Sequence, residues 1–185
     1  MRPEPNAQYG VVTVEFALCV LIFFTVMLLT LEFARMLYVW TTVQEVTRRA
    51  ARAAAVTDFS DTGAVGQLRS NAILGGASVP LAPFLTTARL RIEYLSQAAS
   101  GALSPVGSMP ACPAANTVNC MRDPNGGDCI RYVRASICTT ASGTCDPVPY
   151  VRMTPLLPIP VNVPPSPALI PAQSLGWRPG MASCS

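Results

Sequence analysis

The chain has 185 residues, of which 50% are hydrophobic and 12% are charged, and its net charge of +3 arises from 13 arginines without a lysine. The arginines form no basic run, so the charge pattern gives no indication of nucleic-acid binding. The sequence contains no histidine, which removes the commonest general base and the commonest metal ligand. Because the apolar excess lies in the N-terminal third, the composition predicts a single-pass membrane protein with one small domain.

An apolar segment without a charge or a helix breaker covers residues 16–31. With its N-terminal flank it covers residues 11–31, which as an α-helix would be roughly 32 Å long, enough to cross a bilayer core of about 30 Å. Glu15 lies inside this segment. A carboxylate at membrane depth is costly, so we expect Glu15 to have a partner or a function.

The helix is expected to continue as an amphipathic helix that ends near Asp58. Glu45 is spaced to form an ion pair with Arg49, one turn further on. The apolar face either contacts other subunits or forms the spine of the chain's own domain, and the second interpretation is favoured. Apolar residues recur at three- and four-residue steps on one face, and polar residues occupy the other: Val39, Val43, Val46, Ala50 and Ala54 against Gln44, Glu45, Arg48, Arg49 and Arg52.

Shorter elements are expected beyond this helix. A second helix is predicted over residues 62–74, with Asp58, Ser60 or Asp61 as its cap. Residues 88–96 alternate as a strand does, with Leu90, Ile92 and Tyr94 on one face. The predicted elements that follow are a loop over residues 96–119, a strand within residues 129–138 with Ile130, Tyr132 or Val133, and Ile137 facing inward, and a third strand over residues 149–154.

The segment from Pro155 onward is rich in proline, which lacks a backbone donor and fixes φ. It cannot form an interior strand and is expected to run extended over a surface. Its apolar residues indicate that it covers something, either its own domain, which is favoured, or another subunit. Trp177 and Cys184 would hold it in place in both cases.

Six cysteines lie in the C-terminal half, and Cys19 lies in the apolar helix. Their spacing contains no CxxC pair, so it favours a disulfide framework over zinc binding or redox chemistry. Among fifteen possible pairings we select a local bridge between Cys138 and Cys145, which flank a turn. The disulfide candidates are Cys112, Cys120, Cys129, Cys138, Cys145 and Cys184.

Disulfides place the domain outside the cytoplasm, whereas counting charges gives the opposite orientation. Arg48, Arg49 and Arg52 follow the apolar segment, and only Arg2 precedes it. The cysteines have more weight, because those arginines would lie about 25 Å beyond the end of the span in a continuous helix.

The N-terminus differs from a secretory signal peptide, because a polar leader and Gly10 precede the apolar helix. The pattern G-V-V-T-V-E resembles the class III signal of type IV prepilins. This resemblance implies that a membrane aspartyl peptidase cuts after Gly10 on the cytoplasmic side, which gives Val11 a charged amine. Glu15 would then neutralise the amine of a neighbouring subunit in a filament. The alternative is an uncut anchor in which Glu15 stays near the headgroups.

A longer stretch, VEFALCVLIFF followed by LEFARMLYVWTTVQEVTRRAARAAA, resembles the N-terminal signature of TadE-like pseudopilins of the tight-adherence pilus system. The resemblance implies that Gly10 and Val11 are the processing site, Glu15 and Phe16 act in assembly, and Glu32 and Arg35 form a pair at the membrane exit. It has two departures: the family often has a proline where this chain has Cys19, Val20 and Leu21, and the system's major pilins have tyrosine in place of Phe16.

The predicted fold class is α+β: a long transmembrane and amphipathic helix, then a small disulfide-stapled domain with a short helix, an antiparallel sheet of two or three strands, and a Pro-rich C-terminal segment. The predicted divisions are a leader over residues 1–10, the helix over 11–58 and an extracytoplasmic domain over 59–185.

The expected function is that of a minor pseudopilin, a structural component of a tight-adherence pilus or a related secretion machine. The implied partners are other pilins, the prepilin peptidase, the inner-membrane assembly platform and the lipid bilayer. The expected location is the inner membrane, with incorporation into a pilus as an option. The alternative is an unprocessed single-pass envelope protein with a ligand-binding domain.

An enzyme is not expected, and neither a cofactor nor a metal is. Asp123 and Asp128 flank an Asn-Gly-Gly sequence that indicates a tight turn. A calcium loop would instead need alternating oxygen ligands and a terminal glutamate.

Overall fold

The computed structural model describes residues 9–140, 143–154, 160–179 and 184. Most of the expected leader therefore lies outside the described residues. The chain forms two compact units: one comprises the residues up to Tyr38 together with residues 152–159, and the other comprises Val39–Val151 with the residues from Pro160 on.

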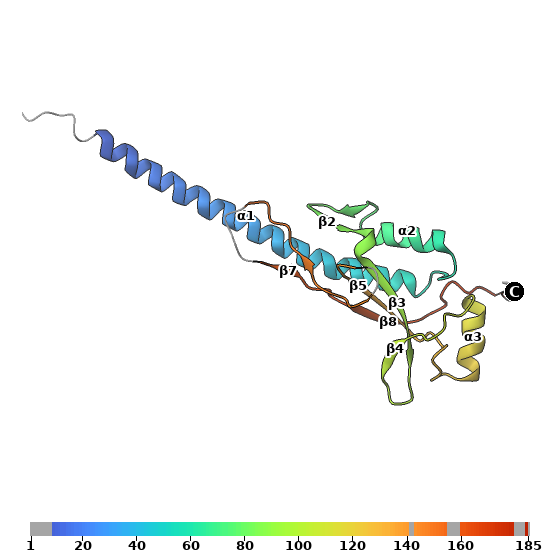
Figure 1. Cartoon of the computed structure of the whole chain (residues 1–185). Coiled ribbons are helices and arrows are strands. Elements are labelled where there is room, and N and C mark those ends of the chain that lie inside the picture. The colour runs from blue at the N-terminus through green and yellow to red at the C-terminus, as the bar shows by residue number, and fades with distance from the viewer. Residues whose placement is uncertain (1–8, 141–142, 155–159, 180–183, 185) are drawn as a thin grey trace, which may run out of the picture. The chain divides into compact units, whose positions relative to one another are not determined.

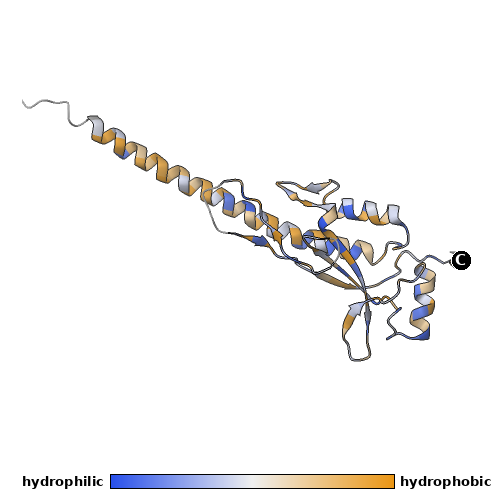
Figure 2. Cartoon of the chain, viewed as in Figure 1, coloured by the Kyte–Doolittle hydropathy of each residue, from blue (hydrophilic) through white to orange (hydrophobic). Residues whose placement is uncertain are grey.

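The first unit is mainly helix. The helix α1 covers Tyr9–Ala54 without a break, as the apolar run predicts, and its N-terminal part belongs to this unit (Figure 1). In the view of Figure 2, most of this part of the helix is coloured as hydrophobic. The hydroxyls of Thr25 and Thr30 donate to the carbonyls of Leu21 and Val26, at 2.7 and 2.8 Å. These two polar side chains are therefore satisfied within the helix, as an apolar environment requires.

The C-terminal part of α1 forms the spine of the second unit. The predicted apolar stripe is buried throughout: Val39, Val43, Val46, Ala50 and Ala54 are each no more than 1% exposed. The polar residues of the opposite face are exposed. The structure thus confirms the interpretation that the stripe packs against the chain's own domain.

The second helix, α2, covers Thr62–Ala72, close to the predicted bounds. Its cap is Asp61, whose side chain accepts hydrogen bonds from the backbone N–H groups of Gly63 and Ala64. This satisfies donors that have no partner inside the helix.

The main sheet is antiparallel, with the strand order β4-β3-β5-β8. The predicted strands appear as β3 (Leu90–Gln97) and β5 (Tyr132–Ile137), which form the centre. Burial confirms Leu90, Ile130, Val133 and Ile137 as inward-facing, but Ile92 and Tyr94 are only partly buried. The ring of Tyr94 packs against that of Phe59. Burial raises the pKa of the Tyr94 hydroxyl to about 12.

The edge strands bring this sheet to four strands instead of two or three. They are β4 (Leu103–Pro105) and β8 (Ala168–Pro171), and both end on a proline. Proline is tolerated at an edge, where the missing N–H removes no bond between interior strands. The expectation that the Pro-rich segment forms no interior strand is therefore confirmed.

The remaining described strands form two smaller, two-stranded sheets. One joins β1 (Ser78–Val79) and β2 (Ala82–Thr86), which the 3-10 helix η2 (Thr87–Arg89) follows. The other joins β6 (Val148–Pro149) and β7 (Asn162–Val163).

The prediction of a strand over residues 149–154 is wrong beyond Pro149, because residues 150–154 form no strand. The pairing is short because β7 lies between Pro160 and Pro164, which have no N–H to continue the ladder.

The predicted loop over residues 96–119 is also partly wrong, because it contains β4 and most of the helix α3 (Pro113–Arg122). Proline at the first turn suits a helix start. The helix interior is otherwise short and polar, and such helices depend on tertiary contacts. Asn116 supplies one of these contacts, since its side-chain oxygen accepts the N–H of Ile130 at 2.8 Å.

Three disulfides are formed: Cys112–Cys184, Cys120–Cys129 and the predicted Cys138–Cys145. Cys19 is free and exposed.

The described residues of the C-terminal segment from Pro160 on lie on the chain's own domain, as expected, whereas residues 155–159 and 180–183 of the predicted segment lie outside the described residues. After β8, the N–H groups of Gln173 and Leu175 both donate to the carbonyl of Ala55, at 3.1 and 3.0 Å. This carbonyl lies directly beyond the last residue of α1, where helix carbonyls lack partners within the helix.

Candidate functional site: the N-terminal helix and Glu32

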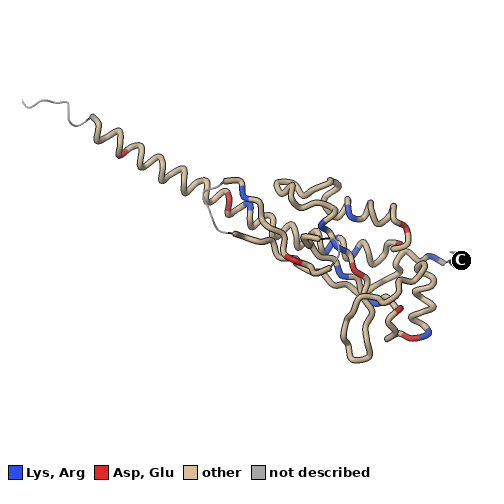
Figure 3. The backbone as a smooth tube through the Cα atoms, viewed as in Figure 1, with Lys and Arg blue, Asp and Glu red and all other residues tan. Residues whose placement is uncertain are grey.

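The N-terminal part of α1 is long and apolar enough to cross a membrane, and no residue of its most apolar window is buried by other parts of the chain. Its large side chains are exposed: Val11, Phe16, Leu21 and Phe23 each expose more than 60% of their surface. Charged residues are sparse along it (Figure 3). Such a surface needs an apolar environment, either lipid or other helices.

The predicted processing and assembly residues all lie in the first turns of α1. Val11 and Glu15 are four residues apart in a continuous helix and therefore share one face. Glu15 is exposed, and Phe16 is 69% exposed. A Cβ added at Gly10 would meet no atom within 4 Å, so packing within this chain does not require glycine there.

Glu32 differs from the residues around it because it is buried, with 5% exposure. Its Oε1 lies 3.6 Å from a guanidinium nitrogen of Arg35, so the structure brings the predicted pair together. The backbone N–H of Met153 also donates to this carboxylate, at 3.1 Å from Oε2 and 3.4 Å from Oε1. The carboxylate thus has both a cation and a neutral donor.

Met153 is a partner that the sequence reasoning missed. It lies 121 residues from Glu32, and it contributes its backbone, which carries no residue-specific signal. The three-residue spacing of Glu32 and Arg35 was visible in the sequence, but the segment that covers this face of the helix was not.

Further along α1, Glu45 and Arg49 form the predicted ion pair, with 2.6 Å between Oε1 and Nε. Their hydrogen bond is the main reason why the pKa of Glu45 is lowered, and desolvation acts in the opposite direction. Both side chains are about half exposed. Solvent screens such a pair, so we assign it little weight in stability.

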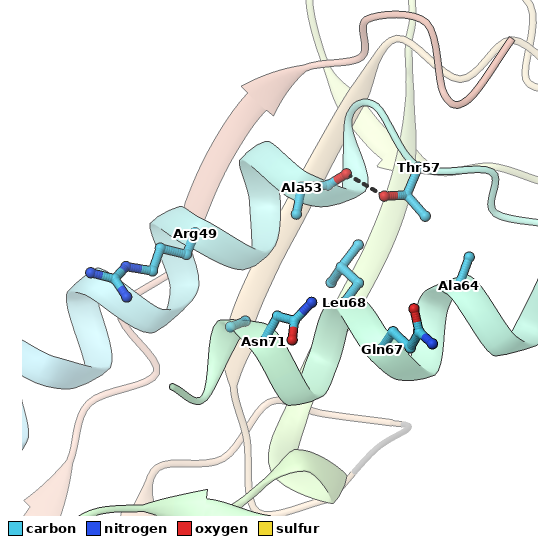
Figure 4. A pocket seen from close by; sticks show the side chains of 8 residues that line it. Arg49, Ala53, Thr57, Ala64, Gln67, Leu68 and Asn71 are labelled. Atoms are coloured by element: carbon cyan, nitrogen blue, oxygen red, sulfur yellow. Dashed lines mark hydrogen bonds between the residues drawn. The ribbon is translucent and has the colours of Figure 1, made fainter. Parts of the chain in front are cut away.

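Arg49 also lines a groove between α1 and α2, with a volume of about 350 Å³ (Figure 4). Gln67 and Asn71 line it from α2, and Thr57, whose hydroxyl donates to the carbonyl of Ala53, lies beyond the end of α1. Arg49 is the single ionisable residue among those that line the groove. The groove therefore holds no pair of groups suited to acid–base chemistry.

The acidic sequence near Asp123 forms a turn, as its glycines indicate. The side-chain carboxylate of Asp123 accepts a hydrogen bond from the N–H of Asn125 at 2.9 Å. The backbone carbonyl of Asp123 accepts one from the N–H of Gly126 at 3.1 Å. Within the described ranges, no group of three or more cysteine or acidic residues is placed to hold a metal ion.

Residues 10–52 match the model of the family described as TadE-like protein. No curated protein and no solved structure gives a significant match. The matched residues are a segment of α1, and they include Gly10, Glu15, Glu32 and Arg35. The match confirms the resemblance found in the sequence.

Proposed function

We propose that this chain, with its TadE-like N-terminal segment, is a minor pseudopilin: a structural component of a tight-adherence pilus or a related secretion machine. The family match and the long exposed apolar helix fit a pilus-associated, membrane-anchored protein. The observation that carries the finer proposal is that the match covers the apolar helix together with Gly10 and Glu15. The protein then works by packing, without a cofactor.

Glu15 is the assembly residue in this proposal. In the isolated chain its carboxylate is exposed within an apolar helix, where an uncompensated charge is costly. Cleavage after Gly10 would create an amine on Val11, and the amine of a neighbouring subunit would neutralise Glu15. Phe16, which is also exposed, would pack against that neighbour. The partners are other pilins, the prepilin peptidase, the inner-membrane assembly platform and the bilayer.

The proposed location is the inner membrane, with α1 as a single span and the second unit outside the cytoplasm. The three disulfides support this orientation, because they persist in oxidising compartments. In the same orientation, Glu32 and Arg35 form the pair at the membrane exit.

Processing is tested by the intact mass of the chain isolated from cells with and without the prepilin peptidase. With the enzyme present, we expect a chain that begins at Val11; without it, a chain that retains the leader. A chain that still begins at Met1 in both strains would exclude processing. It would favour the alternative of an unprocessed envelope protein with a ligand-binding domain.

The assembly role is tested with Glu15→Ala and Glu15→Gln. Both variants lack the charge that would neutralise a neighbouring amine, so we expect both to be cut after Gly10 and to be absent from sheared pili. Immunoblots of the sheared and cell-bound fractions measure the distribution. Glu15→Gln keeps nearly the same shape, so its normal incorporation would show that the charge has no part in assembly.

A further inference from the structure

The position of Glu32 relative to the bilayer follows from the sequence of the span. It is the first charged residue after the apolar run of residues 16–31. If the run crosses the bilayer core, as the proposed function requires, Glu32 lies at its boundary, where a headgroup layer of roughly 5–8 Å separates the core from water. The inference below rests on that membrane anchoring.

The hydrogen bond from Met153 to Glu32 brings a second part of the chain to the same level. The backbone nitrogen of Met153 lies 3.1 Å from Oε2 of Glu32, and both residues belong to the first unit. Residues 152–154 are therefore held at the boundary, 121 residues after the helix residue that holds them.

The side chains presented there suit a membrane surface. Met153 is 72% exposed, and Leu31 and Phe33 beside Glu32 on α1 are each 56% exposed. Arg152 is exposed as well and adds a positive charge. Apolar side chains with neighbouring cations are the composition that binds the interface of a bilayer containing anionic lipids.

Glu32, the one acidic residue among residues 31–35 and 152–154, does not oppose that contact. Its carboxylate is buried, lies against Arg35 and accepts the N–H of Met153. A carboxylate with a cation and a hydrogen-bond donor is tolerated at low polarity far better than a free one. The surface that remains exposed is apolar and cationic.

We propose that residues 152–154 form a second membrane contact beside the span, with an anionic bilayer surface as the partner. Met153 inserts its side chain at the boundary between headgroups and acyl chains, and Arg152 lies among the anionic headgroups. Glu32 is the tether that fixes this segment to α1. The protein therefore meets the membrane at two places that are distant in sequence.

The test uses the full chain, purified and reconstituted in vesicles of phosphatidylethanolamine and phosphatidylglycerol. An NBD fluorophore is attached to the native Cys19, which is free and lies within the span, or to position 153 in a Met153→Cys variant with Cys19→Ser. Lipids with a nitroxide at a shallow or a deep acyl position quench the fluorophore according to its depth. We expect deep quenching at position 19 and shallow quenching at position 153.

The matched control is Glu32→Ala combined with the label at position 153. It removes both the acceptor for Met153 and the partner of Arg35, so we expect most of the shallow quenching to disappear. The label at Cys19 in Glu32→Ala should be quenched as before, which verifies that the variant is still inserted. Arg152→Gln should reduce quenching at position 153 only when the vesicles contain phosphatidylglycerol.

The outcomes separate this inference from the proposed function. Quenching at position 19 but not at position 153 would overturn the second contact and leave the span intact. Absence of quenching at both positions would overturn membrane anchoring itself. Quenching at position 153 that persists in Glu32→Ala would overturn the role of Glu32 as the tether.

Discussion

Gly176 occupies a position that a larger residue cannot take without a shift of the backbone. Its φ is +84°, and a Cβ added there would lie 2.5 Å from the backbone nitrogen of Asp58. The preceding residue, Leu175, is 2% exposed, and its backbone N–H donates to the carbonyl of Ala55. The glycine thus allows the C-terminal segment to lie close against the end of α1.

We expect Gly176→Ala to lower the free energy of unfolding by more than Gly101→Ala. Both glycines have a φ of +84°, but a Cβ at Gly101 would meet no atom within 4 Å. The control therefore carries only the cost of the backbone conformation, about 1–2 kcal/mol, while Gly176→Ala adds the contact with Asp58. Urea unfolding in detergent, followed by circular dichroism, measures both. Equal losses of unfolding free energy in the two variants would show that the C-terminal segment can move away from Asp58 without cost.

The sequence predicted one partner of Glu32, Arg35, but not another, Met153. Its relation to Arg35 is local and follows from the spacing along a helix. Its hydrogen bond with Met153 joins segments 121 residues apart, and no local pattern encodes it.

Among the elements, α1 follows most directly from its sequence. Two patterns overlap in it: an uninterrupted apolar run, and then a stripe with the helical period. The second pattern also correctly predicted what the helix does, because the stripe is the part that the domain buries.

We expect Ala50→Leu to destabilise the second unit, because Ala50 is fully buried on this stripe. Extra methylenes in a packed core typically cost about 1–3 kcal/mol. Gln44→Leu places the same side chain on the exposed face of α1 and should change stability by no more than ~0.5 kcal/mol. Thermal unfolding of both variants provides the comparison. A stability of Ala50→Leu equal to that of the native chain would mean that the stripe has room for a larger side chain.

The other elements divide according to the strength of their local signals. α2 has a capping aspartate and a glycine stop, and β3 and β5 contain β-branched and aromatic residues, so their sequences identified them. α3 lacks a clear apolar period, and disulfides at Cys112 and Cys120 hold it in place. β4 and β8 are short, contain proline and pair only at the edges of the sheet. Tertiary contacts select these three elements, so their local sequences did not predict them.

In the molecule as a whole, the three disulfides close loops of very different size. The residues of Cys112–Cys184 are 72 positions apart, whereas those of the other two bridges are 9 and 7 apart. In the chain-entropy view, a longer loop restricts the unfolded chain more and therefore stabilises the fold more.

We expect the double variant Cys112→Ala with Cys184→Ala to lose about 4.4 kcal/mol of unfolding free energy, and Cys138→Ala with Cys145→Ala to lose about 2.5 kcal/mol. Urea unfolding of the oxidised proteins in detergent measures the difference. The reverse order would show that native contacts around the short bridge outweigh the loop entropy.

The pairing of Cys112 with Cys184 also bears on the order in which the domain matures. In the proposed orientation, a chain that crosses the membrane from its N-terminal side delivers Cys112 before Cys184, which lies 72 positions further on. In that orientation Cys120–Cys129 and Cys138–Cys145 can close as soon as their own loops emerge, but the Cys112 thiol must stay unpaired until Cys184 has also been translocated. The edge strand β8 and Leu175 arrive in the same late interval. In the proposed orientation, the second unit is therefore completed only after Cys184 has been exported, and premature oxidation of Cys112 with a nearer cysteine is the error that its maturation has to avoid.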